Sequence, residues 1–151
     1  MTVSRIDHVG ITTSDVERSL AFYRDLLGMR VIDDLTVTSP EIAALLGEDS
    51  VELRIVDLDS GDGRIVELIK YIQPEGKAVA YESRDHGTGH IAFTIDDLDR
   101  VSRRIAAAGG SVISHQPLKI EEPGGLFDGA TCLYLRDPDG MIIELVQRRS
   151  E

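Results

Sequence analysis

The chain contains 151 residues, with 27 Asp and Glu against 16 Lys and Arg and a formal net charge of −11. An acidic surface argues against nucleic acid or an anionic membrane as a partner, because both of these bind basic surfaces. A single cysteine, Cys132, cannot form an internal disulfide, and no apolar run in the sequence approaches the ~20 residues of a membrane span. These features predict a cytoplasmic globular protein that forms a single domain, residues 1–151.

A sequence repeat divides this domain into two halves. Residues 8–16, His-Val-Gly-Ile-Thr-Thr-Ser-Asp-Val, correspond to residues 90–98, His-Ile-Ala-Phe-Thr-Ile-Asp-Asp-Leu. Each segment is a β-rich apolar run that reaches an aspartate and is followed by apolar residues at helical spacing. These are Val16, Leu20, Phe22, Tyr23 and Leu27 in the first half, and Leu98, Val101, Ile105 and Ala108 in the second. We therefore expect a strand and then a helix at the start of each half.

The ends of the two halves also match. Residues 62–69, Asp-Gly-Arg-Ile-Val-Glu-Leu-Ile, correspond to residues 139–146, Asp-Gly-Met-Ile-Ile-Glu-Leu-Val. Asp-Gly before an apolar run indicates a tight turn, so each glutamate should lie mid-strand on the return arm of a hairpin. Further strands are expected at 30–37, 51–57, 111–114 and 131–136, and a surface loop at 121–129. Each half then reads βαβββ, with modules at about 4–72 and 88–149 and a polar linker at 73–87.

Each half carries one histidine and one glutamate within its apolar strands: His8 and Glu67 in the first, His90 and Glu144 in the second. A single strand histidine is most often a hydrogen-bonded core residue, and a single strand glutamate most often faces solvent. The recurrence of both residues in both halves favours a joint site instead. A divalent cation between two carboxylates, completed by two neutral imidazoles, removes the cost of burying these charges.

These residues and their flanking motifs resemble the vicinal oxygen chelate superfamily, which includes glyoxalase I, methylmalonyl-CoA epimerase, extradiol dioxygenases and the bleomycin- and fosfomycin-resistance proteins. The motifs are Ile6-Asp7-His8-Val9, the segment 19–29, Gly89-His90-Ile91-Ala92-Phe93, and Asp137-Pro138-Asp139-Gly140 leading to Glu144. The resemblance implies an α+β fold of two tandem βαβββ modules that form a cup-shaped, eight-stranded curved sheet. It further implies one divalent metal ion (Ni, Co, Zn, Mn or Fe) held by His8, Glu67, His90 and Glu144, a small-molecule substrate and a homodimer.

Four protein ligands on a six-coordinate metal leave two open positions, which suit a substrate that chelates through two neighbouring oxygens. A ligand carboxylate can also act as the base, which makes Glu144 and Glu67 the candidate catalytic residues. The sequence therefore predicts a metal-dependent isomerase or lyase, glyoxalase I-like or epimerase-like, that transfers a proton α to a carbonyl.

Two other functions remain open at this point. An Fe(II) extradiol-type dioxygenase would use His8, His90 and Glu144 and needs three open positions, so Glu67 as a fourth ligand counts against it. An antibiotic-sequestering resistance protein commonly lacks the ligand set that this chain keeps. The glutathione-binding arginine and asparagine of bacterial glyoxalase I would fall on Thr12 and Tyr71, which counts against glutathione as the thiol carrier. Tyr134 is expected to be a core or cup-lining residue, and Cys132 a small buried hydrophobic one.

Overall fold

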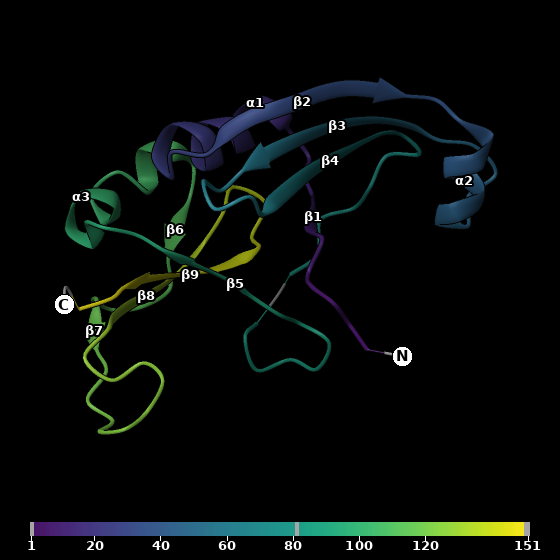
Figure 1. Ribbon diagram of the computed structural model, residues 1–151. Coiled ribbons are helices and arrows are strands. Elements are labelled where there is room, and N and C mark those ends of the chain that lie inside the picture. The colour runs from purple at the N-terminus through teal and green to yellow at the C-terminus, as the bar shows by residue number, and fades with distance from the viewer. Residues whose placement is uncertain (1, 81, 150–151) are drawn as a thin grey trace. The chain divides into compact units, whose positions relative to one another are not determined.

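The computed structural model describes residues 2–80 and 82–149. The chain divides into two compact units, Met1–Ala78 and Val79–Glu151, called the N-terminal and the C-terminal unit below. Each unit contains its own sheet with both parallel and antiparallel strands and only short helices (Figure 1). The predicted α+β class is therefore confirmed.

The N-terminal unit begins with strand β1 (His8–Thr12), which leads into helix α1 (Val16–Leu20) and a π-helical turn η1 (Ala21–Leu26). Asp15 caps α1 by accepting a hydrogen bond from the backbone N–H of Arg18, as expected for an aspartate before a helix. Three strands follow, β2 (Arg30–Val37), β3 (Glu52–Asp59) and β4 (Ile65–Gln73). The sheet has the order β1-β4-β3-β2, in which β1 is parallel to β4 and the other pairs are antiparallel.

Helix α2 (Pro40–Leu46) lies between β2 and β3 and was not expected from the periodicity. Its signals are local: Ser39 accepts from the backbone N–H of Ile42, Pro40 occupies the first turn, and Gly47 ends the helix at a φ of 74°. Ala43 of this helix packs with Val51 and Leu53, so α2 extends the core at one end of the sheet (Figure 1). Within the described ranges, no helix is long and apolar enough to cross a membrane.

The C-terminal unit repeats this order of elements. Strand β5 (Ile91–Thr94) leads into helix α3 (Leu98–Ser102), a 3₁₀ turn η2 (Ala106–Ala108), and the strands β6 (Ser111–Val112), β7 (Leu118–Lys119), β8 (Thr131–Arg136) and β9 (Ile142–Gln147). Strand β5 is parallel to β9, while β8 is antiparallel to β9, β6 and β7. Strand β7 was not predicted, so the described sheets have four and five strands where the sequence indicated eight in all.

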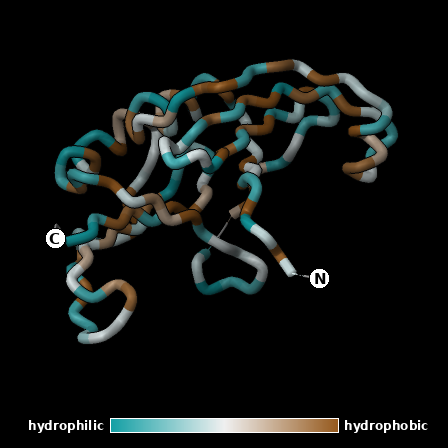
Figure 2. Tube along the Cα trace, in the orientation of Figure 1, coloured by the Kyte–Doolittle hydropathy of each residue, from teal (hydrophilic) through white to brown (hydrophobic). Residues whose placement is uncertain are grey.

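The two faces of each sheet differ in what they carry. In the N-terminal unit one face presents Val56, Leu58, Val66 and Leu68, which are buried like Phe22 and Tyr23 of the helical segment. The matching buried residues of the C-terminal unit are Leu133, Leu135, Ile143 and Leu145. Because side chains alternate along a strand, Glu67 and Glu144 lie on the opposite face, called the His–Glu face below. Hydrophobic and hydrophilic residues accordingly follow one another along β3 and β4 (Figure 2).

The helix-covered face sets the stability of the N-terminal unit. Leu68 is 0% exposed, whereas Leu45 on α2 is 84% exposed. We expect Leu68→Ala to lower the free energy of unfolding by about 2–5 kcal/mol, because it leaves a cavity in a packed core. Leu45→Ala removes the same atoms from the surface and should change the free energy of unfolding by less than about 0.5 kcal/mol. Urea unfolding of both variants measures this, and equal losses would contradict the assignment of the core.

Candidate functional site

Parallel pairing of β1 with β4 brings His8 and Glu67 together. Gly10 pairs with Glu67, and His8 is two residues before Gly10, so His8 lies on the same face of the sheet and diagonally next to Glu67. The distance from His8 Nε2 to Glu67 Oε1 is 4.0 Å, and the side chains are 49% and 23% exposed. A histidine and a half-buried glutamate, both predicted as site residues, are therefore neighbours on the N-terminal unit.

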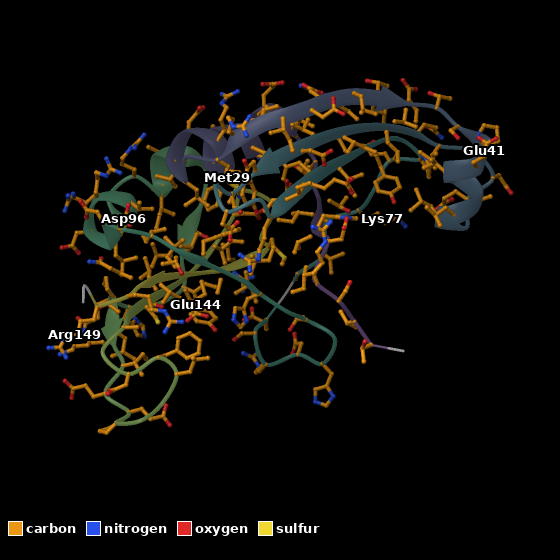
Figure 3. All side chains as sticks on the ribbon, in the orientation of Figure 1. Met29, Glu41, Lys77, Asp96, Glu144 and Arg149 are labelled. Carbon is orange, nitrogen blue, oxygen red and sulfur yellow. The ribbon has the colours of Figure 1, made fainter. Side chains whose placement is uncertain are left out.

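The C-terminal unit repeats this arrangement. Ala92 of β5 pairs with Glu144 of β9, and His90 immediately precedes β5. The distance from His90 Nε2 to Glu144 Oε2 is 3.1 Å, with side chains 42% and 13% exposed. Figure 3 labels Glu144 on β9. The structure thus brings the four predicted site residues together as two pairs, one pair in each unit.

Asp7 supports the histidine of the first pair. Its Oδ1 atom lies 3.3 Å from His8 Nδ1, and its Oδ2 atom accepts a hydrogen bond of 2.9 Å from Arg5. The hydrogen bond with His8, and then the one with Arg5, hold the pKa of the Asp7 carboxyl below its ordinary value. An imidazole whose Nδ1–H is held by a carboxylate keeps its Nε2 lone pair available for a metal ion.

Tyr134 supports the glutamate of the second pair. Tyr134 lies opposite Glu144 on β8, and its hydroxyl is 3.3 Å from Glu144 Oε2 and 3.1 Å from His90 Nε2. Cys132, two residues earlier on β8, pairs with Val146 and so lies diagonally next to Glu144 on the same face. Burial raises the pKa of both the Tyr134 hydroxyl and the Cys132 thiol, and the nearby Glu144 raises them further. The Tyr134 hydroxyl is therefore a protonated donor at neutral pH.

The sequence predicted Tyr134 as a core or cup-lining residue and Cys132 as a small buried residue, with no role for either. Cys132 is buried, and the Tyr134 hydroxyl contacts the predicted ligands Glu144 and His90. The signal for Tyr134 was the hairpin itself, because the turn between β8 and β9 sets Tyr134 opposite Glu144. The register of the β8–β9 hairpin can be counted outward from its turn, Asp137-Pro138-Asp139-Gly140.

Asp57 occupies the corresponding position in the N-terminal unit. It lies opposite Glu67 on β3, and Asp33 of β2 lies opposite Asp57 in turn. Burial and then the charge of Asp33 raise the pKa of the Asp57 carboxyl, while His8 lowers it. The first pair therefore lies beside a carboxylate where the second pair lies beside a hydroxyl, a difference that the repeat in the sequence did not reveal.

The donor atoms suit a divalent metal ion, but each pair is incomplete. Imidazole nitrogens and carboxylate oxygens are the common ligands of Zn²⁺, Ni²⁺, Co²⁺, Mn²⁺ and Fe²⁺. In residues 2–80 and 82–149, no group of three or more His, Cys, Asp and Glu side chains could hold a metal ion. Each unit by itself offers one imidazole and one carboxylate, fewer than the three or four protein ligands of a catalytic metal site.

The two positions expected to bind glutathione carry no cation. Thr12 pairs with Ile69 at the end of β1. Tyr71 follows on β4 and packs against the cluster of Ala43, Val51 and Leu53. The Tyr71 ring therefore belongs to the apolar contact between α2 and the sheet.

Comparison with known proteins identifies the family. The profile of the Glyoxalase/Bleomycin resistance protein/Dioxygenase superfamily matches residues 5–145, and the chain belongs to this superfamily. Lactoylglutathione lyase of Haemophilus influenzae is 31% identical over 97% of this chain and 94% of its own. A glyoxalase family protein from Bacillus cereus has the same fold, with a TM-score of 0.85, 18% identity and coverage of 99% and 97% of the two chains. The trypanothione-dependent glyoxalase I of Leishmania major is 25% identical, with a TM-score of 0.63 and coverage of 96% and 87%.

These relatives confirm the resemblance inferred from the motifs, and the lyases among them confirm the expectation of an enzyme of the glyoxalase type.

The two aspartates of β3 should respond to pH with opposite signs. The pKa of Asp57 is raised, so its ionisation opposes folding, and Asp57→Asn should raise or preserve the free energy of unfolding at pH 7. The pKa of Asp59 is lowered by the Gly61 N–H and by Arg30, so its ionisation favours folding. Asp59→Asn should therefore lower the free energy of unfolding at pH 7. Below pH ~4 both carboxyls are protonated in the unfolded chain, and both effects should shrink.

Urea unfolding of chelator-treated protein at neutral and acid pH measures these two effects. A loss of stability in Asp57→Asn as large as that in Asp59→Asn would contradict the account of the His–Glu face.

Proposed function

We propose that the protein is a divalent-metal-dependent lyase or isomerase of the glyoxalase I type, which transfers a proton at the carbon next to a carbonyl. The observation that carries this proposal is the recurrence of one His–Glu pair at the same register position in both units. The relative from Haemophilus influenzae is named as a lyase that acts on lactoylglutathione. Lactoylglutathione is a 2-hydroxyacyl thioester, which a proton shift relates to the adduct of a 2-oxoaldehyde and a thiol.

His8, Glu67, His90 and Glu144 would together hold the metal ion. Two imidazoles and two carboxylates give a neutral centre around a divalent cation, and a six-coordinate ion keeps two positions for substrate oxygens. When bound, the metal would polarise the substrate carbonyl and stabilise the negative charge that develops on its oxygens. The half-buried carboxylate of Glu67 beside His8 supports a set of four protein ligands rather than three.

The proton is moved by the carboxylates of this chain. Glu67 or Glu144 takes the proton from the carbon that carries the sulfur and returns it to the neighbouring carbonyl carbon. The hydroxyl on the first carbon loses its proton and becomes the thioester carbonyl, and the oxygen of the former carbonyl takes up a proton and becomes a hydroxyl. The overall step is therefore an isomerisation of the adduct with no net gain or loss of protons. Asp7 orients His8, and Tyr134 donates to Glu144.

The charges beside the first pair bear on the identity of the thiol carrier. Thr12 and Tyr71 supply no cation for a glutathione carboxylate, and Asp57 and Asp33 add negative charge beside the first pair. A carrier that is neutral or cationic at this end fits these charges better than an anionic one. The Leishmania major relative, named as trypanothione-dependent, is an example of an enzyme of this type with another thiol.

We further propose that the chain works as a homodimer. Large apolar side chains lie exposed in both units, among them Leu45 at 84%, Leu118 at 60% and Leu126 at 79%. Exposed apolar side chains of this size favour association when they form a contiguous patch. The two pairs would then combine either within one chain or between two chains.

Removing either pair should abolish both metal binding and activity. In His8→Ala/Glu67→Ala and in His90→Ala/Glu144→Ala, a single pair remains, and we expect bound metal to be lost and kcat/KM to fall by about 10²–10⁴-fold. The matched control, His115→Ala/Glu121→Ala, removes the same residue types from outside the pairs and should behave as wild type.

Elemental analysis of protein purified without chelator measures the metal. Activity is followed as thioester formation from methylglyoxal, with glutathione and with trypanothione as the thiol, after addition of Ni²⁺, Co²⁺, Mn²⁺, Zn²⁺ or Fe²⁺. A wild-type protein that binds none of these ions would refute the proposed function.

Mixing the two double variants distinguishes the two ways of combining the pairs. If the pairs combine between chains, a mixed dimer contains one intact set of four ligands, and part of the activity should return. If they combine within a chain, no intact set forms and the mixture should stay inactive.

A further inference from the structure

The His–Glu pairs of the two units differ in the residues that support them. The strands of the two units can be matched residue by residue, because Glu67 pairs with Gly10 and Asp57 as Glu144 pairs with Ala92 and Tyr134. Ile55, which pairs with Ile69, then corresponds to Cys132, which pairs with Val146. The hydroxyl that donates to Glu144 is therefore replaced by a carboxylate beside Glu67, and the neighbouring thiol of Cys132 by an alkyl side chain.

The two histidines also differ in the residue that precedes them, and here the N-terminal unit has the supporting side chain. His8 is preceded by Asp7, whose carboxylate lies 3.3 Å from Nδ1, whereas His90 is preceded by Gly89, which has no side chain to offer. Among the described residues, a carboxylate lies against the histidine of the N-terminal pair, whereas a hydroxyl lies against both members of the C-terminal pair. The glutamate therefore has a side-chain hydrogen-bond donor only in the C-terminal unit of the described structure.

From this we infer that Tyr134 is a positioning residue that holds Glu144 in place as a metal ligand, and that Glu67 is the more loosely held carboxylate of the two. This inference rests on the proposed metal site. It goes beyond that proposal because the repeat by itself would make the two carboxylates equivalent.

The contacts of the Tyr134 hydroxyl explain why it acts on Glu144. The hydroxyl has one proton and two acceptors within reach, Glu144 Oε2 at 3.3 Å and His90 Nε2 at 3.1 Å. A metal ion on His90 would use the Nε2 lone pair, and the hydroxyl proton would then be donated to Glu144. A donor to one oxygen of a ligating carboxylate limits its rotation, and such partners typically change metal affinity by about 10–100-fold.

The difference in burial agrees with this assignment. The Glu144 side chain is 13% exposed and accepts a hydrogen bond from Tyr134, while the Glu67 side chain is 23% exposed and has the His8 imidazole at 4.0 Å. A carboxylate without a side-chain donor can change its position at lower cost. Glu67 is then the ligand better suited to leave the metal and exchange a proton with substrate.

Titration of the chelator-treated protein with Co²⁺ tests this inference. Tyr134→Phe keeps the ring and removes only the hydroxyl, and we expect the Kd for Co²⁺ to rise about 10–100-fold, with a changed visible absorption spectrum. Tyr23→Phe is the matched control, because it removes a tyrosine hydroxyl from the helix-covered core and should leave the Co²⁺ affinity and spectrum unchanged. Tyr134→Leu removes the ring together with the hydroxyl and should raise the Kd at least as far as Tyr134→Phe.

Circular dichroism and thermal unfolding establish that each variant is folded before titration. If Tyr134→Phe does not fold, Tyr134→Leu carries the test by itself. A Kd and spectrum for the folded Tyr134→Phe, or for Tyr134→Leu in its place, equal to those of wild type would overturn the role of this donor while leaving the proposed function intact. Failure of the wild-type protein to bind Co²⁺, or any of the other ions, would instead overturn both.

Discussion

Parallel pairing between the first and the last strand of each unit is the constraint on which the site depends. Antiparallel hairpins connect the strands in between, but the β1–β4 and β5–β9 pairs join residues that are more than 50 positions apart in the chain. The register of these two pairs sets His8 beside Glu67 and His90 beside Glu144. A shift by one residue would turn each glutamate toward the helix-covered face, because strand side chains alternate. The apolar residues of the helix-covered face therefore also determine which side chains lie on the His–Glu face.

The two faces have opposite physical requirements. Leu58, Leu68 and Leu135 are fully buried under the helical segments and supply the hydrophobic stabilisation. The His–Glu face instead carries charge that is only partly hydrated, and each unit moderates this charge in its own way. The N-terminal unit uses Asp7 and Arg5 around His8, whereas the C-terminal unit uses Tyr134 beside Glu144. The repeat conserves the pair but not its surroundings.

Much of this could be predicted from the sequence, because it depends on local patterns and on the repeat. The strand at 30–37, the helix that begins after Asp15 and the mid-strand positions of both glutamates were all expected and are found. Helix α2 was missed because it has barely two turns and a mostly exposed surface, so its signals were local ones, the caps at Ser39 and Gly47 and the proline at position 40. The roles of Tyr134 and Asp57 were missed because they depend on cross-strand register, which hydrophobic periodicity does not report.

The central claim is that the His–Glu pairs of the two units hold one metal ion together. A crystal structure of the Co²⁺-loaded protein, with anomalous data collected at the cobalt edge, tests this most directly. We predict one anomalous peak at each complete site, from a cobalt ion ligated by His8, Glu67, His90 and Glu144. The Tyr134 hydroxyl should be hydrogen-bonded to Glu144. A cobalt ion bound to a single pair, or at a place that includes neither glutamate, would contradict it.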